Sequence, residues 1–186
     1  MSDWFVLATA RNWTAAVVHQ GIRVLRLQES STPPQDSGRF SEWARNRQLN
    51  PDFTYVEDHL FVTTVHKSVE WLHEAHKRNL LEPELTESFI LAADQSKLVR
   101  DIREHFLKYL NGDGWDRDKN EVVIDVNSGS TTAKIDASSV IVTDEGRLIG
   151  GRINVQRLMK EAEALHPLLF EQQNKIMMQE AGQRIR

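Results

Sequence analysis

Apolar side chains recur at spacings of three to five residues over four long stretches, about 3–28, 55–78, 84–111 and 154–180. This spacing gathers the apolar residues on one face of a helix, so it predicts four amphipathic helices. In the second stretch the apolar stripe runs through Val56, Leu60, Val65, Val69 and Leu72. A breaker-rich loop at 30–38 follows the first helix, and a short helix is expected around 40–47.

Several residues mark where these helices begin, break or end. Asp3 can cap the first helix, and Asn154 is a good N-cap for the last. Gly112 is suited to the left-handed conformation that ends many helices, so the third helix is expected to stop there. The same helix is expected to kink or break near 94–96, because Asp, Gln and Ser favour caps over helix interiors.

The period of the pattern changes between about 121 and 153. Glu121–Val126 and Ser139–Ile153 are rich in β-branched residues, and Asp144–Gly146 has the composition of a hairpin turn. We expect a small antiparallel meander of three or four strands. The predicted fold is therefore mainly α: a single domain, 1–186, forming a bundle of about four long helices with a small antiparallel β-meander inserted between helices 3 and 4 (α+β).

Composition and charge narrow the classes of function. The chain has 186 residues, of which 40% are hydrophobic and 27% charged, as in an ordinary globular protein. It has no cysteine, which excludes disulfides and thiolate metal sites and fits a reducing cytoplasm. The net charge of −4 means that any contact with nucleic-acid phosphate needs a local basic cluster. No membrane span or secretory signal is expected, so we predict a cytoplasmic location.

One short motif contains residue types that could catalyse a reaction. Late in the third helix, Arg100 is followed by the polar Asp101 and, further on, by His105. This arrangement resembles the signature of the HEPN superfamily of helical proteins, in which an arginine and a polar residue precede a histidine. The resemblance implies a metal-independent ribonuclease, often dimeric, with a role in toxin, stress or phage-defence systems. The inserted β-meander has no counterpart in the minimal four-helix form of that superfamily.

The residue types of the motif suit cleavage of RNA, which carries its own nucleophile in the 2′-hydroxyl. His105 can act as general base, and Arg100 can stabilise the charge on the phosphorane without a metal or other cofactor. Asp101 lies one helical turn before His105 and can orient its ring. We expect Glu104, Tyr109 and Arg103 to be accessory residues. The candidate phosphate-binding cations are Lys97, Lys108, Arg147 and Arg152.

The spacing of the motif favours a site shared between two chains. Residues five positions apart on a straight helix point about 140° away from each other, so Arg100 and His105 of one chain diverge. The arginine of one chain can instead meet the histidine of another. The expected partners are therefore an RNA substrate, a second copy of the chain in a homodimer, and a protein partner or antitoxin that restrains the toxin, with no membrane.

Two other interpretations compete with the ribonuclease. His105 lies at the edge of a buried stripe that includes Val99 and Ile102, where a histidine is often structural; the chain would then be a non-catalytic dimeric helical bundle that binds a protein. Histidines also recur along the second helix at 59, 66, 73 and 76. Seven residues span about 10.5 Å along a helix, too far for one metal ion, so a polar seam is favoured over a metalloenzyme.

Overall fold

The computed structural model describes the chain in segments: 1–31, 33, 37–49, 53–105, 108, 111, 120–126 and 131–184. Within these segments the protein is mainly helical, with five short antiparallel strands. This confirms the predicted fold class. No helix in these segments combines the length and the apolar character that crossing a membrane requires.

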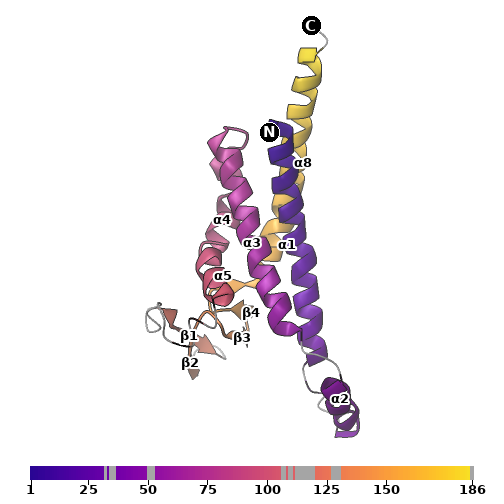
Figure 1. The fold of residues 1–186 in the computed structure, drawn as a ribbon, viewed down its shortest axis with the longest axis vertical. Coiled ribbons are helices and arrows are strands. Elements are labelled where there is room, and N and C mark those ends of the chain that lie inside the picture. Colours follow the sequence, from indigo (N-terminus) through magenta and orange to yellow (C-terminus); the bar gives the residue numbers. More distant parts are fainter. Residues whose placement is uncertain are drawn as a thin grey trace.

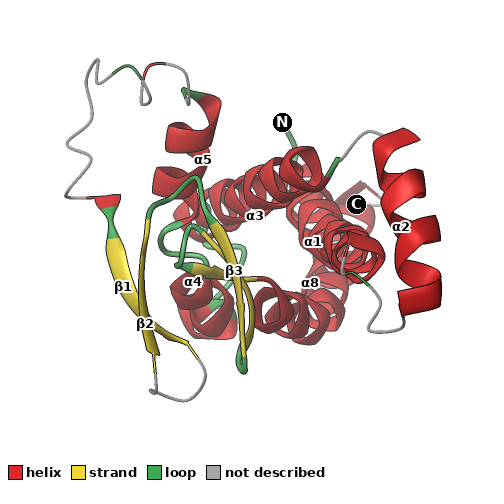
Figure 2. Cartoon of the chain, turned by 90° about the horizontal axis from the view of Figure 1, so that it is seen from below, coloured by secondary structure: helices red, strands yellow, loops and turns green. Residues whose placement is uncertain are grey.

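Three long helices form the body of the protein (Figure 1). They are α1 (Asp3–Ser31), α3 (Thr54–Lys77) and α8 (Val155–Arg184). Helix α1 packs along both α3 and α8, and the view along the bundle shows it between them (Figure 2). Large side chains from all three are fully buried at their contacts, among them Leu7, Phe61 and Leu158.

The predicted third helix is present as separate pieces. A 3₁₀ turn, η1 (Pro83–Leu85), precedes α4 (Glu87–Ala92) and α5 (Ser96–Glu104). The break between α4 and α5, at 93–95, overlaps the predicted 94–96. The structure ends α5 at Glu104, whereas the sequence predicted a helix to 111. Gly112, the predicted cap, lies outside the described residues.

Helix α2 (Ser37–Leu49) confirms the short helix expected around 40–47. It lies at the end of the molecule where α1 finishes and α3 begins (Figure 1). Phe40 and Trp43 stack on each other within this helix, with ring centroids 5.5 Å apart.

The apolar stripe predicted for the second long helix was partly wrong. Val65 and Leu72 are fully buried, but Val56 and Leu60 are 48% and 43% exposed. Leu60 precedes Val65 by five positions, which turns its side chain about 140° away on a straight helix. The buried apolar residues of α3 instead begin at Phe61, after the buried carboxylates Glu57 and Asp58.

The expected small antiparallel meander is present, and its strands divide into two sheets. One is a hairpin of β1 (Val122–Val126) and β2 (Thr131–Ile135); the other joins β3 (Val140–Thr143), β4 (Gly146–Ile149) and β5 (Ile153–Asn154). A turn between β2 and β3 separates them. In that turn the Asp136 carboxylate accepts hydrogen bonds from Ser138 N, Ser138 Oγ and Ser139 Oγ, at 3.0, 2.6 and 2.9 Å.

The second sheet leads directly into α8. Strands β3 and β4 meet at the predicted turn, with Thr143 opposite Gly146, whose φ is +116°. The Asn154 Oδ1 atom accepts a hydrogen bond of 2.9 Å from Arg157 N, which confirms Asn154 as the N-cap of α8. At the start of α1 the cap is different from the prediction: Ser2 Oγ, not Asp3, accepts the hydrogen bond, from Phe5 N at 3.3 Å.

Candidate functional site

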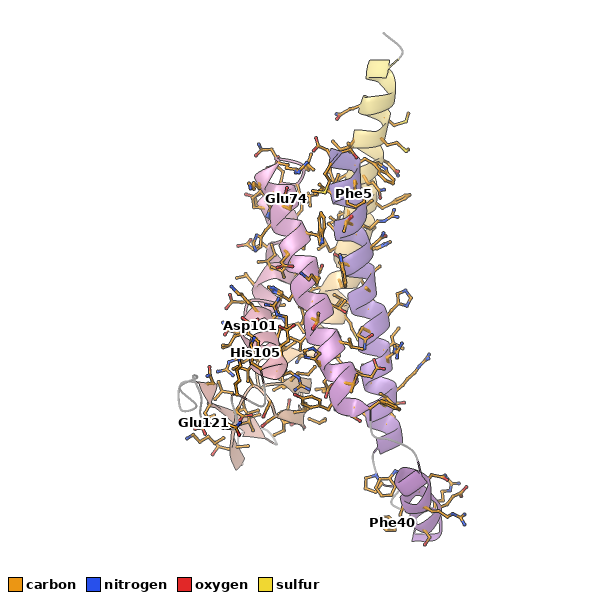
Figure 3. All side chains as sticks on the ribbon, in the orientation of Figure 1. Phe5, Phe40, Glu74, Asp101, His105 and Glu121 are labelled. Carbon is orange, nitrogen blue, oxygen red and sulfur yellow. The ribbon has the colours of Figure 1, made fainter. Side chains whose placement is uncertain are left out.

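Helix α5 carries Arg100 and Asp101 of the motif, and His105 follows its last residue. Its apolar residues Val99 and Ile102 are buried in the core, which fixes the helix against the rest of the protein. Helix α5 lies on the far side of α3 from α1, close to the strands, and Figure 3 shows Asp101 and His105 along it. His105 is the C-cap, with φ −105° and ψ 26°, and its backbone N–H donates to Asp101 O at 3.1 Å.

The guanidinium of Arg100 is held by neighbouring carboxylates. Its Nε donates to Asp101 Oδ1 at 2.9 Å, and its Nη2 donates to the same oxygen. Glu104 lies one turn further on, with Oε1 3.7 Å from Arg100 Nε. The Arg100 side chain is 17% exposed, so these contacts are only partly screened by water. The arginine is therefore oriented along its own helix.

The structure joins the side chains of Asp101 and Arg100, whereas His105 meets Asp101 through its backbone N–H. Among the described residues, no side-chain hydrogen bond joins the His105 ring to Asp101 or Arg100. His105 is exposed to solvent at the end of α5, whereas Arg100 is largely buried. The expected orienting contact from Asp101 to His105 is thus replaced by the contact from Asp101 to Arg100.

The residues expected to be accessory have separate positions. Arg103 is buried: its Nη1 donates to Ser138 O at 3.0 Å, its Nη2 donates to Tyr55 O at 3.1 Å, and its guanidinium lies 4.2 Å from the Tyr55 ring centroid. Burial lowers the pKa of Arg103, although Tyr55 opposes this shift. Arg103 therefore connects α5 to α3 and to the β2–β3 turn. Tyr109 lies outside the described residues.

The four candidate phosphate-binding cations divide into two kinds. Lys97 and Lys108 are exposed. Arg147 is not, because its side chain is 6% exposed and its Nε and Nη2 donate to the two carboxylate oxygens of Asp58, at 3.1 and 2.7 Å. Arg152 is half-buried and its Nη1 donates to Asn120 O and Gly150 O, at 3.0 and 3.2 Å. Both arginines bind other parts of the protein, where we had expected them to attract phosphate.

Two histidines of α3, His59 and His66, have pKa values that charges on α5 influence. The sequence had indicated only a polar seam along this helix. His66 is buried, with Nε2 3.3 Å from Glu70 Oε1. Burial lowers the pKa of His66, and the charge of Arg100 lowers it further. Burial is also the largest cause of the lowered pKa of His59, and the charge of Arg103 is the second cause. The charges of the α5 arginines therefore lower the pKa of both imidazoles. The seven-residue spacing of the two histidines was the signal in the sequence.

The other two histidines of α3 lie near η1 and α4. The rings of His73 and His76 meet edge to face, with centroids 6.1 Å apart, and His76 Nε2 is 2.9 Å from Thr86 Oγ1. They border a shallow groove of about 290 Å³ whose walls include Glu84, Glu87 and Leu91. In the described parts of the chain, no three His, Cys, Asp or Glu side chains are grouped so that they could hold a metal ion.

The sequence matches no protein-family model, and no curated protein or solved structure shows significant similarity to the chain.

Proposed function

We propose that the protein is a metal-independent ribonuclease in which Arg100 of one chain and His105 of a second act on the same phosphodiester. The observation that supports the proposal is the contrast on α5 between an exposed imidazole at the helix end and an arginine oriented by Asp101. This arrangement resembles the HEPN signature.

The reaction uses the 2′-hydroxyl of RNA as its nucleophile. Neutral His105 takes the proton of that hydroxyl, the 2′-oxygen bonds to phosphorus, and the bond from phosphorus to the 5′-oxygen breaks. The proton then passes to the departing 5′-oxygen, which leaves a 2′,3′-cyclic phosphate and a 5′-hydroxyl end. Arg100 stabilises the extra negative charge on the phosphorane, and this balanced sequence of steps needs no metal.

The proposal includes a homodimer because the two residues diverge within one chain. Arg100 is only 17% exposed and is paired with Asp101, while His105 is open to solvent and accessible to a second copy. Lys97 and Lys108 are exposed near the motif in sequence and suit contacts to the RNA backbone. We further propose a cytoplasmic toxin, stress or defence role, with a protein partner or antitoxin that restrains cleavage.

RNA cleavage in the presence of EDTA tests this function. The wild-type protein should cleave, and His105→Ala should lose a factor of about 10² to 10⁴, the usual contribution of a general base. His19→Ala is the matched control, because His19 is also exposed but lies on α1. RNA left intact by wild type, or cleaved equally well by His105→Ala, would contradict the proposal.

A second function is favoured by the exposed apolar side chains of α3. Phe53, Val56 and Leu60 are 54%, 48% and 43% exposed near the start of this helix. A non-catalytic bundle that dimerises and binds a protein partner would use such a surface. The two functions differ in their response to Leu60→Ser, which should abolish partner binding in the second case. If the protein is the ribonuclease, dimers of the Leu60→Ser variant should still cleave RNA.

A further inference from the structure

Helix α2 packs less against the rest of the protein than the other described helices do. Within the described part of the chain it makes at most slight contact with other helices and strands. None of its described side chains, at 38–46, is buried. Figures 1 and 2 show α2 and α5 on opposite sides of α1 and α3. A helix of 13 residues is only marginally stable in water without packing, so a ligand on its exposed surface would stabilise it.

One side of α2 combines two aromatic rings with a cation. Phe40 is 48% exposed (Figure 3), and its ring stacks on that of the partly buried Trp43, with centroids 5.5 Å apart. Arg39 is exposed, and no ion pair joins it to another described residue. At about 100° per residue, the three positions fall within about 100° around the helix. We call Arg39, Phe40 and Trp43 the α2 ring surface.

The charge of α2 is opposite in sign to that of the whole chain. Residues 37–49 contain three arginines and one acidic residue, which gives a net charge of +2, whereas the chain carries −4. In an acidic protein, contact with nucleic-acid phosphate needs a local basic cluster of this kind. An apolar contact with another protein would not need this excess of positive charge. The charge therefore favours a polyanion as the ligand of α2.

We propose that the α2 ring surface binds single-stranded nucleic acid, separately from the residues on α5. The rings of Phe40 and Trp43 would stack on unpaired bases, and Arg39 would contact a neighbouring phosphate. Bases in a duplex are already stacked on each other, so the ligand is a single strand. We assign RNA, the substrate of the ribonuclease. This assignment rests on the proposed function, because aromatic rings and a guanidinium can contact RNA and DNA alike.

The affinity of the protein for a strand that it cannot cleave tests the inference. The probe is a fluorescently labelled 2′-O-methyl oligouridine of about 12 nucleotides, which lacks the 2′-hydroxyl nucleophile, and anisotropy gives its Kd. Phe40→Ala should weaken binding about 5- to 150-fold, the range for the loss of one stacked base. Phe170→Ala is the matched control, because Phe170 is 49% exposed but lies on α8, and it should leave the affinity unchanged.

Two results would overturn the α2 ring surface. One is an absence of binding by wild type at about 50 mM salt, where contacts to phosphate are strong. The other is equal affinity of wild type and Phe40→Ala. The variant should fold, because Phe40 is exposed on a helix that has no described buried side chain. A circular dichroism spectrum equal to that of wild type checks this.

Two arginine variants separate position from net charge. Arg39 and Arg45 are both exposed on α2, but Arg45 lies at least about 120° around the helix from each residue of the ring surface. Arg39→Ala should reduce the slope of log K against log salt by about 0.7, the value for one phosphate of a single strand. Arg45→Ala should change the affinity and the slope less. Equal effects of the two variants would overturn the assigned surface, since net charge alone would then explain binding.

Other strands test the kind of nucleic acid. An RNA duplex should bind wild type and Phe40→Ala equally well, and weaker binding to the variant would contradict stacking on unpaired bases. Oligothymidine DNA that binds more tightly than the RNA probe would overturn the assignment of RNA. Binding without any cleavage of ordinary RNA would contradict the ribonuclease and leave the α2 ring surface standing. Cleavage of RNA with no effect of Phe40→Ala on affinity would contradict the surface alone.

Discussion

Asp58→Ala should destabilise the protein strongly, because it removes one half of a buried ion pair that joins α3 to β4. The side chains of Asp58 and Arg147 are only 1% and 6% exposed. Two hydrogen bonds connect them, from Nε at 3.1 Å and from Nη2 at 2.7 Å. The alanine variant would leave the guanidinium enclosed without its carboxylate.

The size of the effect follows from that burial. Breaking a buried pair by removing one partner costs about 3–5 kcal/mol, whereas an exposed pair contributes about 0–1 kcal/mol. Arg147 also donates to Gln28 Oε1 at 3.3 Å, and this remaining contact favours the lower end of the range. We therefore expect a loss of about 3 kcal/mol, or a fall in Tm of about 6–12 °C for a chain of this length.

Urea unfolding followed by circular dichroism measures this loss. Lys175→Ala is the control, since the pair of Lys175 and Glu171 is 55% and 64% exposed, and it should cost at most about 0.5 kcal/mol. The double variant Asp58→Ala/Arg147→Met should be more stable than Asp58→Ala alone, because no charge remains buried. A loss below about 1 kcal/mol in Asp58→Ala would refute the reasoning, since that value belongs to exposed pairs.

Three further changes test other parts of the structure. Gly150→Ala should cost about 1–3 kcal/mol in urea unfolding, because φ is +63° and the new Cβ would lie 2.9 Å from Ala137 Cα; an unchanged midpoint would contradict this. Asn154→Ala should lower the free energy of unfolding by about 0.5–2 kcal/mol, because it removes the N-cap of α8. Asn154→Asp should keep most of the stability, because its carboxylate can also accept the capping hydrogen bond. The free energy of unfolding should fall as the pH drops below 6.5, because burial lowers the folded-state pKa of His66 and the unfolded state then binds more protons. His66→Gln should reduce that slope, and an equal slope in both proteins would count against the assignment.

Local signals in the sequence were sufficient for most of the secondary structure. Asn154 was predicted as a cap, and Asp144–Gly146 as a turn, because short side chains and glycine have strong preferences at such positions. The break near 94–96 followed from the same preferences. These features depend on neighbours in the chain, so the sequence displays them directly.

Contacts between distant residues were not predicted. Arg147 looked like a surface cation because nothing in the sequence links it to Asp58, on another element. The exposure of Val56 and Leu60 depends on which neighbours α3 has, and hydrophobicity alone does not indicate them. The division of the strands into two sheets depends on the hydrogen bonds that Asp136 accepts in the intervening turn.

The sequence predicted which residues the candidate site contains, but not which of these residues contact each other. The sequence placed Arg100, Asp101 and His105 on one helix, whereas the structure ends that helix at Glu104 with His105 as its C-cap. From the spacing, the sequence predicted that Asp101 orients His105, whereas the Asp101 carboxylate accepts a hydrogen bond from the adjacent Arg100. The influence of α5 charges on His59 and His66 depends on the packing of two helices, so the heptad spacing indicated a seam without showing which charges act on it.

Cleavage by a mixture of two inactive variants tests the shared site most directly. Arg100→Ala and His105→Ala are mixed in equal amounts, allowed to exchange subunits, and incubated with RNA and EDTA. Half of the dimers are then mixed and each has one intact site of two, so we predict about a quarter of wild-type activity. A mixture as inactive as either variant, beside an active wild type, would contradict a site built from two chains.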